Sequence, residues 1–405
     1  MKVLQVNKYH YLRGGAERVF FNTMDLLSSH GHVVIPFCTH YHKNLPSEYD
    51  RYFADAPEIR EQSITGKIKA IPRFFHNSDA ARKLDQLLSD TKPDIAHLHN
   101  IFNGLSMAIL PVFAKHGVPV VWTLHDCRMA CPTPDWMKYG KNCENCRKRL
   151  FLNCIKHRCC DNNAAISLFS MLEMIHKDFL FNYDKYISRY IFLSREYQRI
   201  ISIHRPHFSS KGLILHNFTP ISGIVKETED YLLYFGRVTK EKGVRTILEA
   251  AKQASSVKIK IAGTGEMREY IQQHAPSNVE ALGFLNGEPL TKAIGQAKAV
   301  LVPSESMDNN PMSVIEANML ARPAIGTRIG GIPEIIVPGK TGWLIDVGDA
   351  DALARCMEAA WNMPQGEYAA MRENCRAFAM ENFSPESHYK RLMGIYEDAI
   401  ASSRK

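Results

Sequence analysis

The chain has 405 residues, of which 45% are hydrophobic and 23% charged. Two domains are predicted because this length exceeds one ordinary core, and the composition is that of a soluble globular protein. A membrane-spanning helix is excluded, because no run of about 18 apolar residues occurs and the best candidate, 105–124, contains Lys115, His116, Gly117 and Pro119. The net charge of +8 suits a polyanionic small ligand, an anionic membrane or nucleic acid, and does not choose among them.

The N-terminal sequence MKVLQVN has the pattern of a short strand. It lacks the long apolar region and the cleavage site of a signal peptide, so we expect a cytoplasmic protein. The ten cysteines should then be reduced. Clustered cysteines in a reduced protein indicate a metal site or simple packing rather than disulfides.

Short apolar runs alternate with helical patterns along the whole chain, which is typical of parallel sheets covered by helices. The first set of predicted strands comprises residues 3–7, 33–37, 95–99, 120–124 and 190–194. The second set comprises residues 213–217, 231–236, 258–263, 279–283, 300–303, 324–327 and 343–346. The break between domains is predicted near 219–229, which mixes Pro, Gly, Ser and charge. The tail after Asn382 is amphipathic and helical, and it can stay on the second domain or cross back to the first.

Two glycine-containing turns are candidate anion sites. Gly14 and Gly15 follow the first strand and precede a helix, where backbone N–H groups can approach an anion; a tight turn is the alternative. Arg237 and Lys242 flank a helix start after the strand 231–236. The two cations can neutralise a diphosphate without a metal ion, and an exposed basic turn is the alternative.

Histidines follow two strands of the first set. His125 comes directly after 120–124, in the sequence TLHD, and the segment 94–100, DIAHLHN, ends another strand in the same way. More than one histidine can therefore reach the same edge of the sheet. A purely structural role is the alternative for His125.

Residues 131–160 interrupt the alternation and show neither a strand nor a helix period, so we interpret them as an insertion. A CxxC pair with further cysteines nearby can hold Zn²⁺ through four thiolates. A structural zinc would explain how an irregular loop stays ordered, and reduced, partly buried thiols are the alternative. The candidate ligands are Cys131, Cys143, Cys146 and Cys154, and Cys159 and Cys160 follow closely.

The same insertion is basic and rich in large apolar side chains, which can sit on an anionic membrane surface; a solvated basic face is the alternative. Its basic residues are Lys138, Lys141, Arg147, Lys148, Arg149, Lys156 and Arg158. Its aromatic and leucine residues include Trp136, Tyr139, Leu150, Phe151 and Leu152.

Residues 302–334 are predicted to form a buried strand, a polar loop, a helix, a second strand and a Gly-rich turn. Asp308 lies in the loop, and Glu316 lies about a turn and a half into a helix that Pro311 can open. The C-terminal edge of a parallel strand is where open α/β sheets bind ligands. Glu316 can accept two hydroxyl hydrogens from a group such as a ribose, and its apolar neighbours argue against a solvated helix acid. Amide donors beside Asp308 are Asn309 and Asn310.

These motifs together resemble the nucleotide-sugar-dependent glycosyltransferases of GT-B fold, retaining family 4 (the "glycosyl transferases group 1" type). The resemblance is strongest over 231–342, where GRVTKEKG, IAGTGE, LGF, VPSESMDNNPMSVIEANMLARP, GTRIGGIPEII and GKTGWL occur in the family's order and spacing. It is weaker in NKYHYLRGGAERV, PDIAHLHN and WTLHD. It covers nearly the whole chain.

The resemblance implies an α/β fold of two Rossmann-like domains facing across a cleft. Residues 1–218 would form the acceptor-side domain with the Cys-rich insertion, and residues 219–384 the domain that binds the nucleotide sugar. Residues 385–405 would form a helix that returns to the first domain, as in the family.

The resemblance also implies roles for the matched residues. Gly14 and Gly15 would approach the donor phosphate, Arg237 and Lys242 would hold the diphosphate, and Glu316 would take the ribose hydroxyls. The other donor-side positions are Gly263, Asn309, Asn310, Pro311 and Met312.

The catalytic positions implied by the resemblance are His125, from the first-domain side, and Asp308. The family usually has glutamate at the position of Asp308. The shorter side chain retracts the carboxylate by roughly 1.5 Å, which bears on its contact with the donor sugar.

The implied reaction is retaining transfer of a sugar from a nucleotide-diphosphate sugar to a hydroxyl, without a cofactor for catalysis. A UDP-sugar is favoured and a GDP-sugar is the alternative. The insertion resembles a subset of these enzymes from exopolysaccharide, capsule or O-antigen pathways, which implies a glycan or polyprenyl-linked acceptor at the inner face of the cytoplasmic membrane. No nucleic acid is expected as a partner. The competing hypotheses are a sugar-nucleotide epimerase of the same fold and a non-catalytic zinc-and-basic binding protein.

Overall fold

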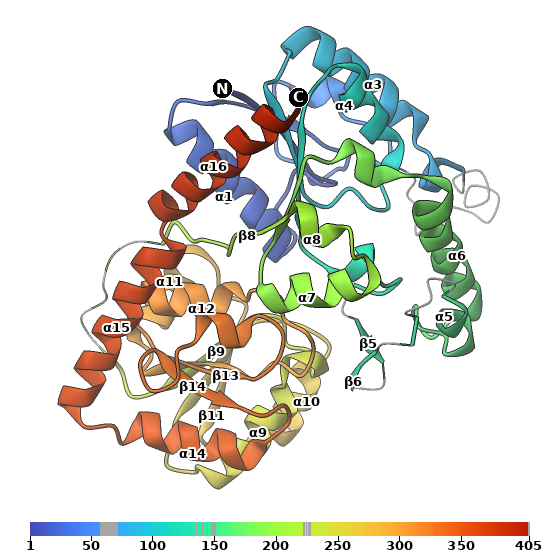
Figure 1. Cartoon of the computed structure of the whole chain (residues 1–405). Coiled ribbons are helices and arrows are strands. Elements are labelled where there is room, and N and C mark those ends of the chain that lie inside the picture. The colour runs from blue at the N-terminus through green and yellow to red at the C-terminus, as the bar shows by residue number, and fades with distance from the viewer. Residues whose placement is uncertain are drawn as a thin grey trace.

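The computed structural model describes residues 1–56, 72–134, 136–138, 141–143, 145–146, 151–221, 223, 225 and 228–403. These residues form two six-stranded parallel sheets, each with helices on both faces, and one short antiparallel pair (Figure 1). The prediction of two α/β domains is confirmed. No helix in these ranges is long and apolar enough to cross a membrane.

The first sheet has the strand order β2-β1-β3-β4-β7-β8. Its strands are β1 (Lys2–Val6), β2 (Val33–Phe37), β3 (Ile95–Leu98), β4 (Val120–Leu124), β7 (Arg189–Phe192) and β8 (Gly212–Ile214). The helices of this half are α1 (Gly15–Ser29), α3 (Ser78–Thr91), α4 (Leu110–Lys115), α7 (Arg195–His204) and α8 (Phe208–Lys211). Short helical turns are η1 (Asp50–Tyr52), η2 (Met107–Ile109), η3 (Cys127–Met129) and η5 (Tyr183–Tyr186).

The grouping of residues 213–217 with the second set of strands is wrong. β8 pairs with β7 in parallel, with Tyr190 beside Gly212, and so forms the edge of the first sheet. The strand ends at Ile214 because the residues after it leave the sheet and contact the C-terminal helix and the second domain. The Leu215 side chain is buried beneath the C-terminal helix, and Asn217 hydrogen-bonds Asn310 of the second domain.

The second sheet has the strand order β11-β10-β9-β12-β13-β14. Its strands are β9 (Leu232–Phe235), β10 (Ile259–Ala262), β11 (Val279–Gly283), β12 (Ala299–Val302), β13 (Ala324–Thr327) and β14 (Gly342–Ile345). The order reverses between β9 and β12, so the loops after these two strands diverge to opposite faces and leave a crevice at the sheet edge, where such folds bind ligands. Its helices are η6 (Lys240–Lys242), α9 (Val244–Gln253), α10 (Arg268–His274), α11 (Gly287–Gln296), α12 (Met312–Met319), α13 (Ile332–Ile335), α14 (Ala350–Trp361) and α15 (Gln365–Phe383).

The last helix, α16 (Pro385–Ser403), lies beside α1 on the first domain, as Figure 1 shows, although α15 before it packs on α12 of the second. Proline at its first position suits a helix start after the break at Ser384. Its apolar residues recur at helical spacing and form one stripe that faces the first sheet. The buried members of that stripe are Leu392, Ile395, Tyr396 and Ala399, and they pack against Val3, Ile95 and Val121.

The prediction that residues 131–160 lack regular structure is wrong. The insertion contains an antiparallel pair, β5 (Met137–Lys138) and β6 (Lys141–Asn142), and a helix, α5 (Leu152–Lys156). The helix α6 (Ala164–Ile175) follows and continues into a π-helical turn, η4 (His176–Leu180). These helices enclose a small core of their own, which supplies the order that the sequence pattern did not reveal. Its buried members are Phe151, Cys154, Met171 and Met174.

Candidate active site

The crevice at the reversal point of the second sheet carries an ion pair. Lys242 ends the short helix η6 after β9, and Asp308 lies in the loop after β12. Lys242 Nζ pairs with Asp308 Oδ2, and Ser304 Oγ donates to the same carboxylate oxygen at 3.0 Å. The two predicted residues are therefore brought together, 66 positions apart in the chain. A cation held beside a helix N-terminus at this edge is suited to a polyanionic ligand.

Arg237 lies at the same edge but is not part of this pair. Its side chain is 70% exposed, and Nη1 lies 3.4 Å from Glu241 Oε1. An exposed pair of this kind contributes little to stability, so the guanidinium can leave Glu241 for a ligand at small cost.

Glu316 is buried, with 2% of its side chain exposed, and pairs with Arg18 of the first domain. Arg18 Nη1 donates to Glu316 Oε1 at 2.7 Å across 298 positions of sequence. Burial raises the pKa of Glu316, and the neighbouring Arg18 charge lowers it. The carboxylate thus lies on the cleft side of α12, opposite the first turn of α1, and is not a solvated helix acid.

The residues next to Asp308 hold the two domains together. Ser194 Oγ donates to Asn309 Oδ1 at 3.0 Å, and Asn310 Oδ1 accepts from the backbone N–H of Asn217 at 2.8 Å. Pro311 lies at the N-cap of α12 and Met312 is its first residue, so the helix begins one residue after the predicted opening. In this structure both asparagine side chains face the first domain. Further junction contacts come from Glu334, whose carboxylate accepts from the backbone N–H groups of Arg195 and Glu196 at 2.9 Å.

The predicted glycines differ in what surrounds them. A Cβ built on Gly15 would meet no atom within 4 Å, and one on Gly14 would meet only Glu17 Oε2 at 3.6 Å. Nothing in the described chain therefore requires glycine at these positions, which leaves room for a ligand. Gly263 has a structural reason instead, since its Cβ would lie 1.9 Å from the carbonyl oxygen of Gly236.

His125 follows β4 and stacks on His99, which follows β3. Its Nε2 lies 2.9 Å from His99 Nδ1, and His99 Nε2 lies 3.0 Å from Gln5 Oε1 of β1. Burial lowers the pKa of His125 to about 4 and that of His97 to about 3, and it holds the pKa of His99 well below 6.5. All three imidazoles are therefore neutral at physiological pH.

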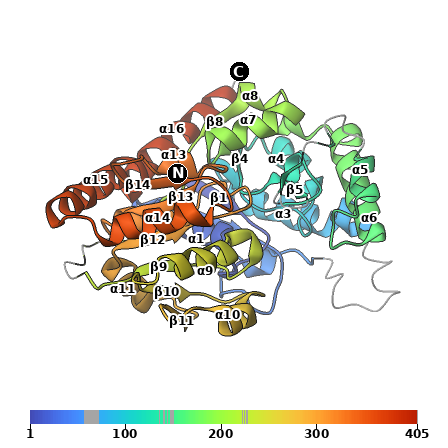
Figure 2. The ribbon, with the colours of Figure 1, turned by 90° about the horizontal axis from the view of Figure 1, so that it is seen from below.

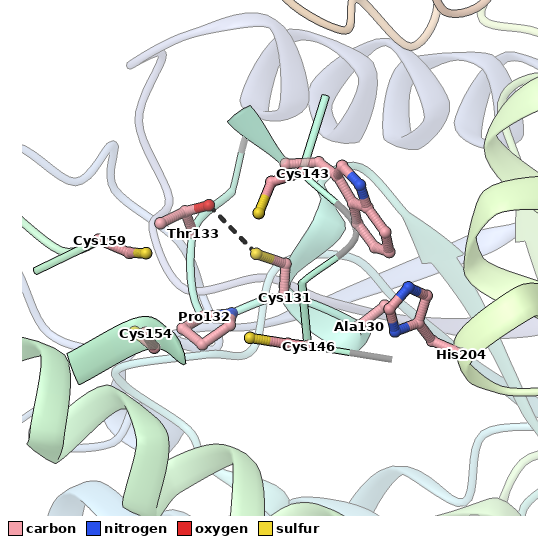
Figure 3. Close-up of a pocket in the computed structure, with 10 residues that line it drawn as sticks. Ala130, Cys131, Pro132, Thr133, Cys143, Cys146, Cys154, Cys159 and His204 are labelled. Atoms are coloured by element: carbon pink, nitrogen blue, oxygen red, sulfur yellow. Dashed lines mark hydrogen bonds between the residues drawn. The ribbon is translucent and has the colours of Figure 1, made fainter. Parts of the chain in front are cut away.

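The cysteines of the insertion face a small cavity of about 20 Å³. Figure 3 shows the sulfur atoms of Cys131, Cys143, Cys146 and Cys159 directed toward one another. The sulfur of Cys154 is instead 3.9 Å from that of Cys160 and 3.7 Å from the carbonyl oxygen of Ser167, which it can contact as a donor.

These thiols form no disulfide. Burial raises the pKa of Cys131 to about 12 and that of Cys146 to about 11, so both are protonated at neutral pH. Among the described residues, no three His, Cys, Asp or Glu side chains form a group arranged to hold a metal ion. The zinc site stays a prediction.

Some predicted surface residues of the insertion lie outside the described residues, namely Tyr139, Arg147, Lys148, Arg149 and Leu150. The side chains of Lys138 and Lys141 lie outside them too. Lys156, Arg158 and Leu152 are exposed, whereas Phe151 and Trp136 are buried.

Sequence reasoning missed the partners that complete the site. Arg18 and Ser304 contact two of the predicted acids, and Gln5 and His99 support His125. Arg18 lies four residues after Gly14, on the first turn of the helix that begins at Gly15. This spacing is the signal from which Arg18 could have been identified.

Two family patterns match consecutive parts of the chain. Residues 13–177 match the family described as Glycosyltransferase Family 4, and residues 220–378 match Glycosyl transferases group 1. Among curated proteins, the putative colanic acid biosynthesis glycosyltransferase WcaL of Escherichia coli K12 is 25% identical over 203 residues. That alignment covers 47% of this chain and 50% of the relative, so the matched segment spans about half the relative's length.

The chain is also similar in fold to solved glycosyltransferase structures. Anabaena Alr3699/HepE in complex with UDP superposes with a TM-score of 0.66 at 15% identity, over 97% of this chain and 99% of that one. The lipopolysaccharide outer core galactosyltransferase WaaB gives 0.65 at 16% identity, over 99% of both chains. Together the two family patterns span most of the chain, in the order of its two sheets, and the chain belongs to the GT-B-fold glycosyltransferases with a family 4 N-terminal and a group 1 C-terminal domain.

Proposed function

We propose that this chain transfers a sugar from a nucleoside-diphosphate sugar to a hydroxyl of a glycan or polyprenyl-linked acceptor, with retention of anomeric configuration. The observation that carries the proposal is the pair of ionic contacts flanking the cleft, Lys242 with Asp308 and Arg18 with Glu316. A UDP-sugar is the favoured donor, in keeping with the UDP bound to the Anabaena protein. The product is part of a bacterial surface polysaccharide, as the name of the E. coli relative indicates for that protein.

On the donor side, the proposal assigns the diphosphate to Lys242 and Arg237. Lys242 then exchanges its partner Asp308 for phosphate oxygens, and Arg237 gives up its long contact with Glu241. Glu316 accepts the ribose hydroxyls, and the open backbone at Gly15 approaches the phosphate from the first domain. Asp308, released from Lys242, faces the transferred sugar with a side chain one methylene shorter than glutamate.

In the reaction, the bond from the anomeric carbon to the diphosphate oxygen breaks, and a bond to the acceptor oxygen forms on the same face. The acceptor proton ends on the departing diphosphate. Lys242, Arg237 and the helix N-termini stabilise the negative charge that develops on the leaving group. His125 positions a hydroxyl from the first-domain side.

The test is product analysis by mass spectrometry with a panel of UDP- and GDP-sugars, after a thermal-shift screen has found the donor that stabilises the fold. Transfer or hydrolysis frees the nucleoside diphosphate. An epimerase leaves the nucleotide on the sugar, and that product would refute the proposal. Unchanged turnover in both Arg237→Ala and Glu316→Ala would show that the site is elsewhere.

The acceptor is presented at the inner face of the cytoplasmic membrane, and the insertion together with the helix α6 that follows it supplies the contact with that membrane. Both views place α5 and α6 at the outer side of the N-terminal domain, away from the second sheet (Figure 1, Figure 2). Leu168, Leu172 and Phe179 are exposed along one side of α6 and η4, at helical spacing. Lys156 and Arg158 are exposed beside them on and after α5. Exposed leucines flanked by basic residues suit an anionic bilayer surface.

Vesicle flotation tests this contact. We expect the protein to bind phosphatidylglycerol-containing vesicles and not pure phosphatidylcholine. The double variant Leu168→Glu, Leu172→Glu should lose binding, whereas Val347→Glu, an exposed valine on the other domain, should keep it. Equal binding by the double variant would refute the assignment to α6.

We also propose that the insertion binds a structural Zn²⁺. For this proposal we take Cys131, Cys143, Cys146 and Cys159 as the ligands, with Cys159 in place of Cys154, because the sulfur of Cys154 contacts the carbonyl oxygen of Ser167 instead (Figure 3). The thiols would have to draw closer and lose their protons to bind the ion. Zinc content per chain measures this directly. Cys143→Ser and Cys159→Ser should lose zinc, while Cys154→Ser and the buried Cys38→Ser should retain it. A wild-type protein without zinc would show that these residues are reduced, partly buried thiols and would refute the proposal.

A further inference from the structure

A continuous row of buried polar side chains links the C-terminal helix to His125. The row lies on the face of the first sheet that α16 covers. It begins where the apolar contact between α16 and the sheet ends, and it continues toward the C-terminal ends of the strands. Side chains alternate along a strand, so every second residue shares this face. The layer next to α16 is Val3, Ile95 and Val121. Two residues further along the same strands come Gln5, His97 and Thr123, and then His99 and His125.

The orientation of the Gln5 amide in this structure determines where the protons of the row are. The amide oxygen Oε1 of Gln5 can only accept, so His99 Nε2, 3.0 Å away, carries a proton. A neutral imidazole has one N–H, and His99 Nδ1 is therefore an acceptor. His125 Nε2 lies 2.9 Å from it and must donate. His125 is thus the Nε2–H tautomer, and its Nδ1 has a free lone pair.

The contacts at the other end of the row are consistent with the same orientation of Gln5. Gln5 Nε2 donates to the hydroxyl of Tyr396 at 3.2 Å, and that hydroxyl donates to His97 Nδ1 at 2.7 Å. His97 Nε2 then donates to Thr123 Oγ1 at 2.7 Å. With the Gln5 amide oriented as it is in this structure, every contact of the row joins one donor and one acceptor. Flipping the amide would reverse every donor in the row and place the proton of His125 on Nδ1, so the orientation of Gln5 sets the tautomer of His125.

The free nitrogen of His125 belongs to a side chain that is not fully enclosed by the protein. In the described part of the chain no residue hydrogen-bonds Nδ1, and the side chain is only half-buried. The preceding carbonyl, Leu124, is 3.5 Å from Asn309 Nδ2, so β4 ends against the loop that carries Asp308. The lowered pKa values of the three histidines keep the row neutral, and the tautomer rather than the charge of His125 is what the row determines.

We propose that Gln5 and His99, with Tyr396 behind them, are positioning residues that hold His125 as the Nε2–H tautomer so that Nδ1 accepts a hydrogen bond from a sugar hydroxyl. The proposal rests on the proposed function for the identity of that hydroxyl. The state of the imidazole itself does not depend on any substrate.

The first measurement is therefore made on the free protein. Long-range ¹H–¹⁵N correlation spectra of histidine-labelled protein, with His125 assigned through His125→Asn, distinguish protonated from bare ring nitrogens. We expect Nε2 protonated and Nδ1 bare in His125 at neutral pH. His99→Phe removes the acceptor and should give a tautomer mixture, whereas His99→Asn retains a short acceptor and should preserve the wild-type state. His388→Phe, at a buried histidine of α16 outside the row, should leave His125 unchanged.

The second measurement is kinetic. His99→Phe should lower kcat by about 10- to 100-fold, in the range of proton-positioning groups, with the donor KM within about threefold of wild type. His99→Asn should recover most of that loss. Tyr396→Phe should have a smaller effect in the same direction, because Gln5 can still reach His97 Nδ1 from 3.5 Å.

The outcomes of these measurements distinguish failure of the positioning role from failure of the proposed function. A wild-type His125 protonated at Nδ1, or His99→Phe with unchanged tautomer and kcat, would overturn the positioning role. A protein that handles no nucleotide sugar but shows the expected tautomers would instead refute the proposed function.

Discussion

The two walls of the cleft are built from opposite kinds of chemistry. The C-terminal wall presents formal charges, with Lys242 against Asp308 and Glu316 against the incoming Arg18. The N-terminal wall presents neutral hydrogen-bonding groups, with His125 backed by His99 and Gln5. Charges suit the part of a donor that is itself charged, and neutral groups of fixed tautomer suit uncharged hydroxyls. Under the proposed function, this division assigns most of donor binding to the C-terminal domain and the orientation of a hydroxyl to the N-terminal domain.

The largest effect should come from acid, which protonates the buried histidines of the neutral wall. His97 and His125 have folded pKa values of about 3 and about 4 against 6.5 when unfolded, so the unfolded chain binds more protons as pH falls below 6.5. The contribution of these two histidines to stability should be constant above pH 6.5 and drop by about 1.4 kcal/mol per pH unit for each, on the order of 4 kcal/mol together at pH 5. Urea unfolding between pH 5 and 7.5 measures this. His97→Gln should flatten the slope and the exposed His274→Gln should not; a slope that neither variant changes would contradict the assignment.

The charged wall is tested by Lys242→Ala. Loss of the cation opposite the leaving diphosphate should lower kcat/KM by about 100- to 1,000-fold, since charge stabilisation in the transition state is removed. The matched control is Lys252→Ala on the exposed side of α9, which should behave as wild type. Similar losses in both variants would mean a general charge effect rather than a diphosphate contact.

The contact between the walls is tested by Glu316→Gln. It keeps the shape but loses the charge that Arg18 and the ribose hydroxyls share, so the donor KM should rise by about 10- to 100-fold. Isothermal titration with the free nucleoside diphosphate gives the same quantity without turnover. Arg18→Ala in the same titration shows whether the arginine supports or competes with the nucleotide, and unchanged affinity in Glu316→Gln would place the ribose elsewhere.

The smallest effect should come from Asp308→Glu. Adding the methylene that the family usually has moves the carboxylate toward the donor sugar, so the ratio of kcat/KM between two epimeric donors should change by about tenfold or less. Competition between the two donors in one reaction measures the ratio. An unchanged ratio would mean that Asp308 pairs with Lys242 but does not contact the donor sugar.

The fold and the charged wall could be predicted because their signals are local. Apolar runs predict the strands of both sheets, Lys242 and Asp308 each follow a strand within a few residues, and Glu316 lies in the helix after the loop of Asp308. The pairings could not be predicted, since Arg18 and Glu316 are 298 positions apart and Gln5 and Tyr396 are 391 apart. No short-range pattern encodes such contacts; they appear only once the strand order is known.

The prediction for the cysteine insertion was wrong for a different reason. Its helices are short, and α6 is apolar on both its buried and its exposed sides, so no amphipathic period marks it. The choice between Cys154 and Cys159 depends on which side of α5 each residue occupies, and spacing alone does not decide that.

The chain passes between the domains twice, once between β8 and β9 and once at Ser384 between α15 and α16. Two crossings define a hinge axis, so rotation about that axis is the motion that disturbs the backbone least. Because α16 lies beyond the second crossing, it moves with the first domain, and Tyr396 moves with Gln5. Opening or closing the cleft would remake the contact between Arg18 and Glu316 while the histidine row turns as one rigid body, assembled from the two ends of the chain.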